Sequence, residues 1–171
     1  MNLNKFIRDI PDFPQPGILF RDITPLLQNP EAFSYSIDKL CESVKALGGE
    51  AIVGIESRGF IFAAPVAARL GLPFIPVRKP GKLPAERKTV EYSLEYGSSQ
   101  LDIHLDALVP GQGVVVIDDL LATGGTSKAA AELVEMVRGH VRGMLFVVEI
   151  ASLNGREVLK DYECSSLVRF D

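Results

Sequence analysis

The feature that most constrains the fold is a regular alternation of short apolar runs with longer segments of helical periodicity. The apolar runs occupy residues 51–55, 72–77, 114–117 and 144–148, and the helical patterns occupy residues 30–47, 60–70 and 124–138. Such short runs predict buried strands, and their alternation with helices is typical of βαβ units around a parallel sheet. We therefore expect one α/β domain over residues 1–171, with a central, mainly parallel sheet flanked by helices.

Composition excludes several classes of protein. Of the 171 residues, 47% are hydrophobic and 23% charged, and the net charge is −4, which is typical of a globular domain and does not favour nucleic acid as a partner. Cys41 and Cys164 form no CxxC or Cys/His cluster, so we expect free thiols. Residues 1–17 lack a signal-peptide core, and no apolar run reaches the roughly 20 residues that span a bilayer. We expect a cytoplasmic protein with no membrane partner.

Two segments depart from the alternation. Residues 1–30 contain Pro11, Pro14, Pro16 and Gly17, which predicts an irregular N-terminal segment because proline removes backbone donors and fixes φ. Residues 78–100 lack core-type apolar runs, and a long excursion of this kind inside a compact domain is usually functional. We expect a flexible loop over the active site there, with a strand resuming at about residue 101.

The most informative segment follows the apolar run that ends at Ile117. Asp118 and Asp119 come directly after it, and the small-residue turn 122–126 then begins a helix. Backbone N–H groups and hydroxyls at a helix N-terminus suit a monophosphate, and the paired carboxylates can accept hydrogen bonds from a sugar diol. Neither a Walker A loop nor a GxGxxG fingerprint is present.

Charged residues follow two other expected strands. Ser57 and Arg58 come after Ile55 and suit an anion, although a surface arginine at a helix start is the alternative. Three basic residues crowd the loop after Val77, where a solvated basic loop competes with neutralisation of a polyanion; they are Arg78, Lys79 and Lys82. Glu95 lies in an apolar and aromatic stretch, and without context it could equally be a surface glutamate.

The order of hydrophobic strand, two acids and Thr-Gly-Gly-Thr resembles the ribose-phosphate motif of the type I phosphoribosyltransferases. Further stretches resemble the members of this family that take adenine as their base, and they extend the match over nearly the whole chain. These stretches are residues 13–27, 56–60, 78–84, 92–97 and 152–156. Glu56 and Pro80 stand where an Asp and a basic residue would also be accepted. The resemblance implies the type I phosphoribosyltransferase fold.

The resemblance also implies roles for individual residues. Asp118 and Asp119 would bind the ribose of phosphoribosyl pyrophosphate, and a non-proline cis peptide is expected near Glu56–Ser57. The 5′-phosphate would be held by Ala122, Thr123, Gly124, Gly125 and Thr126. The pyrophosphate would be held by Ser57, Arg58, Arg78, Lys79 and Lys82. The adenine would contact Leu19, Phe20, Arg21 and Leu120, with Phe20 and Leu120 on either side of the ring. Glu95 would be the catalytic acid or base facing the purine.

The implied reaction joins adenine to phosphoribosyl pyrophosphate and gives AMP and pyrophosphate. The resemblance implies Mg²⁺ bound through the substrate, with no direct protein ligand, and a homodimer. Two alternatives stay open. An enzyme for an oxopurine would need a donor toward O6, for which Lys128 lies too far into its helix. A non-catalytic nucleotide sensor would be expected to add a DNA-binding domain and to lose residues such as Arg58, Lys82 and Glu95.

Overall fold

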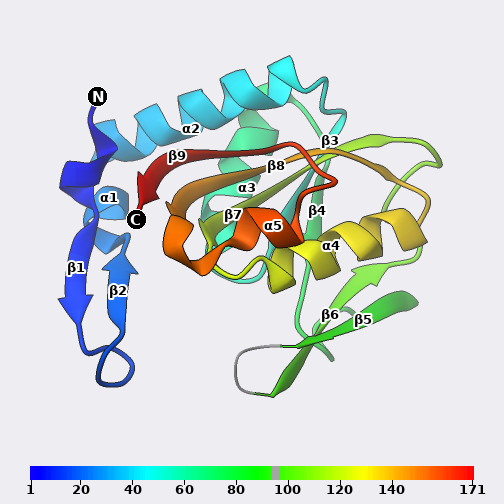
Figure 1. Cartoon of the computed structure of the whole chain (residues 1–171). Coiled ribbons are helices and arrows are strands. Elements are labelled where there is room, and N and C mark those ends of the chain that lie inside the picture. Colours follow the sequence, from blue (N-terminus) through cyan, green and yellow to red (C-terminus); the bar gives the residue numbers. More distant parts are fainter. Residues whose placement is uncertain (94–96) are drawn as a thin grey trace.

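A five-stranded parallel sheet forms the centre of the molecule (Figure 1). The computed structural model describes residues 1–93 and 97–171, with Ser93 described through its backbone alone. The strands are β3 (Ala51–Ile55), β4 (Phe74–Val77), β7 (Gly113–Leu121), β8 (His140–Ile150) and β9 (Cys164–Phe170), in the order β4-β3-β7-β8-β9. Every neighbouring pair is parallel. The expected α/β fold with a parallel central sheet is therefore confirmed.

Helices cover both faces of this sheet. On one face, α2 (Pro30–Ala46) and α3 (Arg58–Leu70) pack against the sheet, and Ile37 and Phe62 are buried among strand residues such as Ile52. On the other face lies α4 (Gly125–Met136), whose Leu133 shares a second core cluster with Val116. Two buried layers of this kind exclude water from both sides of β3 and β7, which holds the ends of these strands in fixed positions.

Local signals explain where the helices begin and end. The Asn29 side chain accepts a hydrogen bond from the Ala32 N–H at 2.9 Å, and Pro30 occupies the first turn of α2. Gly71 ends α3 with a positive φ of 65°, a conformation that glycine adopts without steric cost. These expected boundaries are confirmed within a few residues.

The N-terminal segment is more regular than expected. It contains η1 (Leu3–Phe6), β1 (Arg8–Pro11), β2 (Leu19–Asp22) and α1 (Thr24–Gln28). The two strands pair in an antiparallel hairpin from Arg8↔Asp22 to Pro11↔Leu19, so the expectation of an irregular segment is wrong except for the turn between them. Four-residue strands that are half exposed leave too little alternation to be recognised in the sequence.

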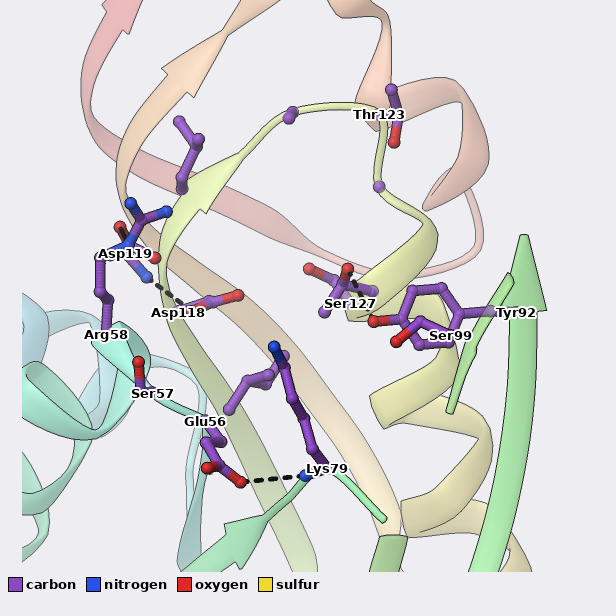
Figure 2. Close-up of a pocket in the computed structure, with 15 residues that line it drawn as sticks. Glu56, Ser57, Arg58, Lys79, Tyr92, Ser99, Asp118, Asp119, Thr123 and Ser127 are labelled. Atoms are coloured by element: carbon purple, nitrogen blue, oxygen red, sulfur yellow. Dashed lines mark hydrogen bonds and ion pairs between the residues drawn. The ribbon is translucent and has the colours of Figure 1, made fainter. Parts of the chain in front are cut away.

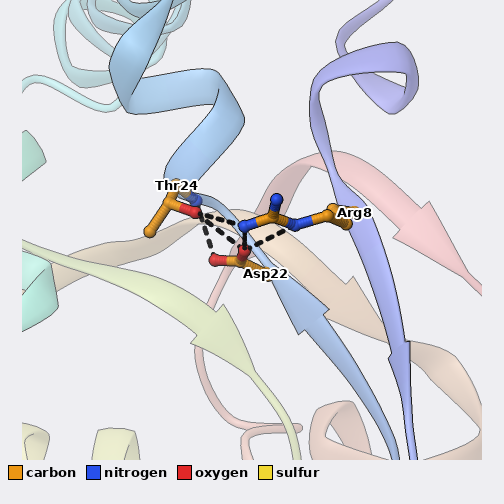
Figure 3. Close-up of polar contacts among 3 residues, drawn as sticks. All are labelled: Arg8, Asp22 and Thr24. Atoms are coloured by element: carbon orange, nitrogen blue, oxygen red, sulfur yellow. Dashed lines mark hydrogen bonds and ion pairs between the residues drawn. The ribbon is translucent and has the colours of Figure 1, made fainter.

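A polar cluster fixes the base of this hairpin (Figure 3). The Arg8 guanidinium donates to the Asp22 carboxylate at 2.6 Å and to the Thr24 hydroxyl at 3.2 Å, and the Thr24 N–H donates to Asp22 at 2.9 Å. Burial alone would raise the pKa of Asp22, but the hydrogen bonds from Thr24 and Arg8 outweigh burial and lower it. The hairpin is thereby joined to the start of α1.

A second antiparallel hairpin corrects the expectation of a loop over residues 78–100. It consists of β5 (Arg87–Ser93) and β6 (Ser98–His104), and an isolated bridge between Arg78 and Asp102 ties it to the end of β4. Among the described residues of this stretch, irregular backbone is found at residues 79–86 and at Gly97. The strand at 87–93 could not be predicted from an apolar pattern, because its described side chains are mostly polar and exposed.

Three C-terminal elements have no counterpart in the sequence analysis. They are η2 (Ala151–Leu153), α5 (Gly155–Val158) and β9. Only Val168 of the edge strand β9 is buried, so the strand lacks the apolar run that marks β3 and β7. Among the described residues, no helix has the length and apolar character needed to cross a membrane.

Candidate active site

The carboxyl ends of β3 and β7 meet at a cavity of about 490 Å³ (Figure 2). Ligands in open α/β sheets bind at this edge, where the loops after neighbouring strands converge. The cavity is lined by Ile55, Glu56, Ser57, Arg58, Lys79, Tyr92, Ser99, Asp118, Asp119, Leu120, Ala122, Thr123, Gly124, Thr126 and Ser127. The structure thus brings together segments that lie far apart in the sequence.

Two adjacent carboxylates form one wall of this cavity. Asp118 and Asp119 lie within β7, which extends four residues beyond the predicted end at Ile117. Their residues are only 9% and 5% exposed. Burial raises the pKa of Asp118 well above its usual range and the charge of Asp119 raises it further, while burial also raises the pKa of Asp119 against the opposing charge of Arg58. Buried acceptors of this kind favour a ligand that donates hydrogen bonds, such as a diol.

Arg58 lies between the carboxylate of Asp119 and the aromatic ring of Phe20. Its Nε lies 2.7 Å from Oδ2 of Asp119, and its guanidinium lies 5.8 Å from the centre of the Phe20 ring. Arg58 is the first residue of α3, directly after Ser57, and the Glu56–Ser57 peptide is cis, as the family resemblance implied. The guanidinium keeps almost half of its side-chain surface exposed, so it can still meet an anion in the cavity.

The turn after β7 leads directly into the start of α4. Gly124 has a φ of 86° and precedes the first residue of the 12-residue helix. Thr123, Gly124, Thr126 and Ser127 line the cavity here. The exposed N–H groups and the helix dipole favour a negatively charged group. The structure therefore places the predicted phosphate-binding turn beside the two carboxylates, with Ser127 as an added hydroxyl.

The three predicted basic residues of the next loop separate in the structure. Arg78 faces Glu56, with Nε–Oε2 and NH2–Oε1 distances of 3.1 and 3.3 Å, and it also donates to the Lys82 carbonyl. Burial would raise the pKa of Glu56, but hydrogen bonds from the Lys79 N–H and from Arg78 outweigh burial and lower it. Of the three, only Lys79 is among the described residues that line the cavity (Figure 2). Arg78 thus organises the loop through Glu56.

The β5–β6 hairpin closes the far side of the cavity with two residues that the sequence analysis did not single out. Tyr92 and Ser99 are direct cross-strand partners, and the Tyr92 hydroxyl lies 3.4 Å from Oγ1 of Thr126. Their placement depends on strand register, so the sequence held no signal for it. Glu95, the predicted catalytic residue, lies outside the described residues.

A second cavity of about 440 Å³ adjoins the first. It is lined by Ile18, Leu19, Phe20, Arg21, Leu120, Ala122, Thr123, Thr126, Ile150 and Leu153. All four predicted adenine contacts are in this set, and Leu120, Ala122, Thr123 and Thr126 line both cavities. Most of these side chains are apolar, which suits a flat heteroaromatic ring. A polar cavity therefore adjoins an apolar one.

Within residues 1–93 and 97–171, no group of three or more His, Cys, Asp or Glu side chains could hold a metal ion. The cavity fits a Mg²⁺ ion that is bound through substrate oxygens and water, beside the carboxylates of Asp118 and Asp119.

Comparison with known proteins agrees with this geometry. The model of the phosphoribosyl transferase domain matches residues 26–168. The chain therefore belongs to the phosphoribosyltransferase family.

Relatives with high sequence identity within that family are adenine phosphoribosyltransferases. An adenine phosphoribosyltransferase from Synechococcus sp. is 57% identical over the full length of both chains. The crystal structure of the adenine phosphoribosyltransferase from Thermoanaerobacter pseudethanolicus is 51% identical, with a TM-score of 0.95 over 98% of each chain. The Saccharomyces cerevisiae adenine phosphoribosyltransferase, crystallised with D-2,5-dideoxy-2,5-imino-altritol 1,6-bisphosphate and adenine, is 40% identical, with a TM-score of 0.92 over 96% of each chain.

Proposed function

We propose that this chain is an adenine phosphoribosyltransferase, which transfers the phosphoribosyl group of phosphoribosyl pyrophosphate to adenine and releases AMP and pyrophosphate. The observation that supports it most is the pair of adjoining cavities, one polar and one apolar, that share Leu120, Ala122, Thr123 and Thr126. A nucleoside monophosphate has the same division, with a base on one side of its ribose phosphate. The relatives at more than 50% identity support adenine as the base.

Phosphoribosyl pyrophosphate occupies the polar cavity in this proposal. The turn 122–126 holds the 5′-phosphate with its N–H groups and hydroxyls, and Asp118 and Asp119 accept hydrogen bonds from the ribose. Ser57, Arg58 and Lys79 face the pyrophosphate from the other wall. Arg78 and Lys82 act on the same group through the loop that Glu56 holds.

Adenine occupies the apolar cavity. Phe20 and Leu120 contact the two faces of the ring, and backbone groups at Leu19 and Arg21 meet its exocyclic amine. The Arg21 guanidinium does not take part in this contact, because it pairs with Asp9 and lies 4.0 Å from the centre of the Phe170 ring. Leu120 borders both cavities and therefore lies where the new bond forms.

The reaction exchanges one bond at C1 of the ribose for another. The bond from C1 to the pyrophosphate oxygen breaks, the bond from C1 to N9 of adenine forms, and the N9 proton leaves. No enzyme nucleophile is needed, so the residues act by orienting the substrates and stabilising charge. When bound, Mg²⁺ neutralises the charge on the pyrophosphate oxygens.

Glu95 is the proposed proton acceptor for this step. We expect Glu95→Ala to lower turnover far more than affinity for phosphoribosyl pyrophosphate. Glu91→Ala is the matched control, because Glu91 is an exposed carboxylate only four residues earlier in the chain. Equal losses of turnover and affinity in Glu95→Ala would reject the acid/base role.

The function is tested by a spectrophotometric assay with Mg²⁺, phosphoribosyl pyrophosphate and one purine base at a time. AMP formed from adenine, with little product from guanine, hypoxanthine or xanthine, is the expected result. Turnover of another base would retain the phosphoribosyl transfer and reject the assignment of the apolar cavity. Binding of AMP without turnover of any base would favour a nucleotide sensor.

The family resemblance also supports a homodimer, which light scattering after gel filtration would test. Cys41 and Cys164 are both free, in keeping with the proposed cytoplasmic location, where thiols stay reduced.

A further inference from the structure

We propose that Glu149 and Arg156 form a positioning pair that sets the affinity of the turn 122–126 for the 5′-phosphate, from behind the cavity. The proposal rests on the proposed function, which assigns the 5′-phosphate to this turn. Neither residue is among the described residues that line either cavity.

The pair begins with a buried carboxylate that has no place in the proposed chemistry. The Glu149 side chain is only 3% exposed, at the end of β8, where it is the register partner of Leu121 in β7. It therefore lies beside the last residue before the turn. Arg156 donates to it through Nε and NH2, both at 2.7 Å, and Ser166 donates at 2.6 Å. The Arg156 hydrogen bonds, with Ser166 in support, lower the pKa of Glu149 to about 2 despite burial.

Arg156 is the second residue of α5, so the pair fixes the place of that short helix. Besides its two bonds to Glu149, it donates to the Cys164 carbonyl at 2.9 Å. One guanidinium thereby connects α5 to both β8 and β9. Bidentate hydrogen bonds of this kind fix orientation as well as distance.

The backbone of α5 is packed directly against the phosphate-binding turn. A Cβ on Gly155 would overlap the Ala122 carbonyl oxygen and come within 2.8 Å of the Leu121 side chain. A Cβ on Gly124 would lie 2.7 Å from the Gly155 carbonyl oxygen. Because glycine stands on both sides of the contact, the two backbones touch with no side chain between them. A displacement of α5 is therefore transmitted to the N–H groups of the turn.

The test compares Arg156→Gln with Arg169→Gln. Arg169 is the matched control, because its Nε lies 3.8 Å from the same Glu149 carboxylate but it belongs to β9 and is 61% exposed. Both changes remove one positive charge near Glu149, and only the first releases α5. Calorimetry measures the affinity of each folded variant for ribose 5-phosphate and, separately, for pyrophosphate with Mg²⁺.

We expect Arg156→Gln to weaken ribose 5-phosphate binding about tenfold or more, the scale of lost charged hydrogen bonds, and to leave pyrophosphate binding unchanged. Arg169→Gln should change neither. Gly155→Ala keeps the ion pair but pushes on Ala122, so the same selective loss is expected. If Arg156→Gln does not fold, Arg156→Lys, which retains one charged donor, takes its place with a smaller loss.

Two results would overturn the proposal. One is unchanged ribose 5-phosphate binding in both the Arg156 variant and Gly155→Ala. The other is an equal loss for ribose 5-phosphate and pyrophosphate, which indicates general damage to the site. Failure of the proposed function is a separate result, since it requires the wild-type chain to form no AMP from adenine.

Discussion

Replacing Gly59 with alanine should damage the proposed ribose site through a single methyl group. Gly59 is the second residue of α3, where this helix crosses the end of β7. A Cβ there would lie 2.7 Å from Oδ1 of Asp118, 3.0 Å from the Ile117 carbonyl oxygen and 3.2 Å from the Asp118 Cα. Two of these three atoms are backbone, so the methyl group cannot be accommodated by a side-chain rotation alone.

The expected magnitude follows from two opposing terms. Alanine favours a helix over glycine by at most about 1 kcal/mol, whereas overpacking a tight contact costs about 1–3 kcal/mol. The free energy of unfolding should therefore fall by up to about 2 kcal/mol. The Asp118 carboxylate must also move, and losing a hydrogen bond to a charged group costs about 1.5–3 kcal/mol. We expect kcat/KM for phosphoribosyl pyrophosphate to fall roughly 10- to 150-fold.

The assay is steady-state kinetics with each substrate varied in turn, together with urea unfolding. Ala68→Gly is the control, because Ala68 is exposed on the same helix and isolates the helix-propensity term. It should lower stability by about 1 kcal/mol with normal kinetics. A Gly59→Ala enzyme that is more stable than wild type, with an unchanged KM for phosphoribosyl pyrophosphate, would refute the reasoning.

Three further predictions concern charge and burial. Asp118→Asn combined with Asp119→Asn should weaken phosphoribosyl pyrophosphate binding, and near-normal kinetics would contradict the ribose assignment. Phe20→Ala should raise KM for adenine alone, whereas Leu120→Ala, which alters both cavities, should raise KM for both substrates; identical profiles would contradict the division of the site. The pKa of Glu149 is lowered to about 2, so its ion pair stabilises the fold above the ordinary glutamate pKa, by about 3 kcal/mol, and this contribution is lost as pH falls toward 2. Thermal unfolding of wild type and Glu149→Gln should therefore differ at pH 7 and converge near pH 2, and a constant difference would contradict this origin.

Local sequence was sufficient for the elements that form the sheet and its helices. The strand Ala51–Ile55 agrees with its predicted bounds, and the helix after Asn29 begins where the cap and Pro30 predict. Continuous apolar runs and capping residues are local properties, so they survive without knowledge of the fold. The strands with mixed or exposed faces, β1, β2, β5 and β9, could not be recognised in this way.

The residues of the site also divide into those that local sequence predicted and those that only the fold brings together. Asp118, Asp119 and the turn 122–126 lie close together in the sequence, which predicted a site for a monophosphate and a diol, and the structure places all of them except Gly125 on one cavity. Tyr92 enters that cavity only through the register of a hairpin. Arg78 was expected to face the anion, but it pairs with Glu56, a carboxylate 22 residues away. The role of Glu95 stays a prediction.

The sequence by itself determined the class of fold and the position of the proposed phosphate-binding turn and the adjacent acids, because each depends on residues that are neighbours along the chain. Only the tertiary structure decided which basic residues face the cavity, that an apolar cavity adjoins it, and that α5 supports the turn from behind. Those features depend on strand register, side-chain direction and backbone contacts between distant segments, which packing determines and local composition does not.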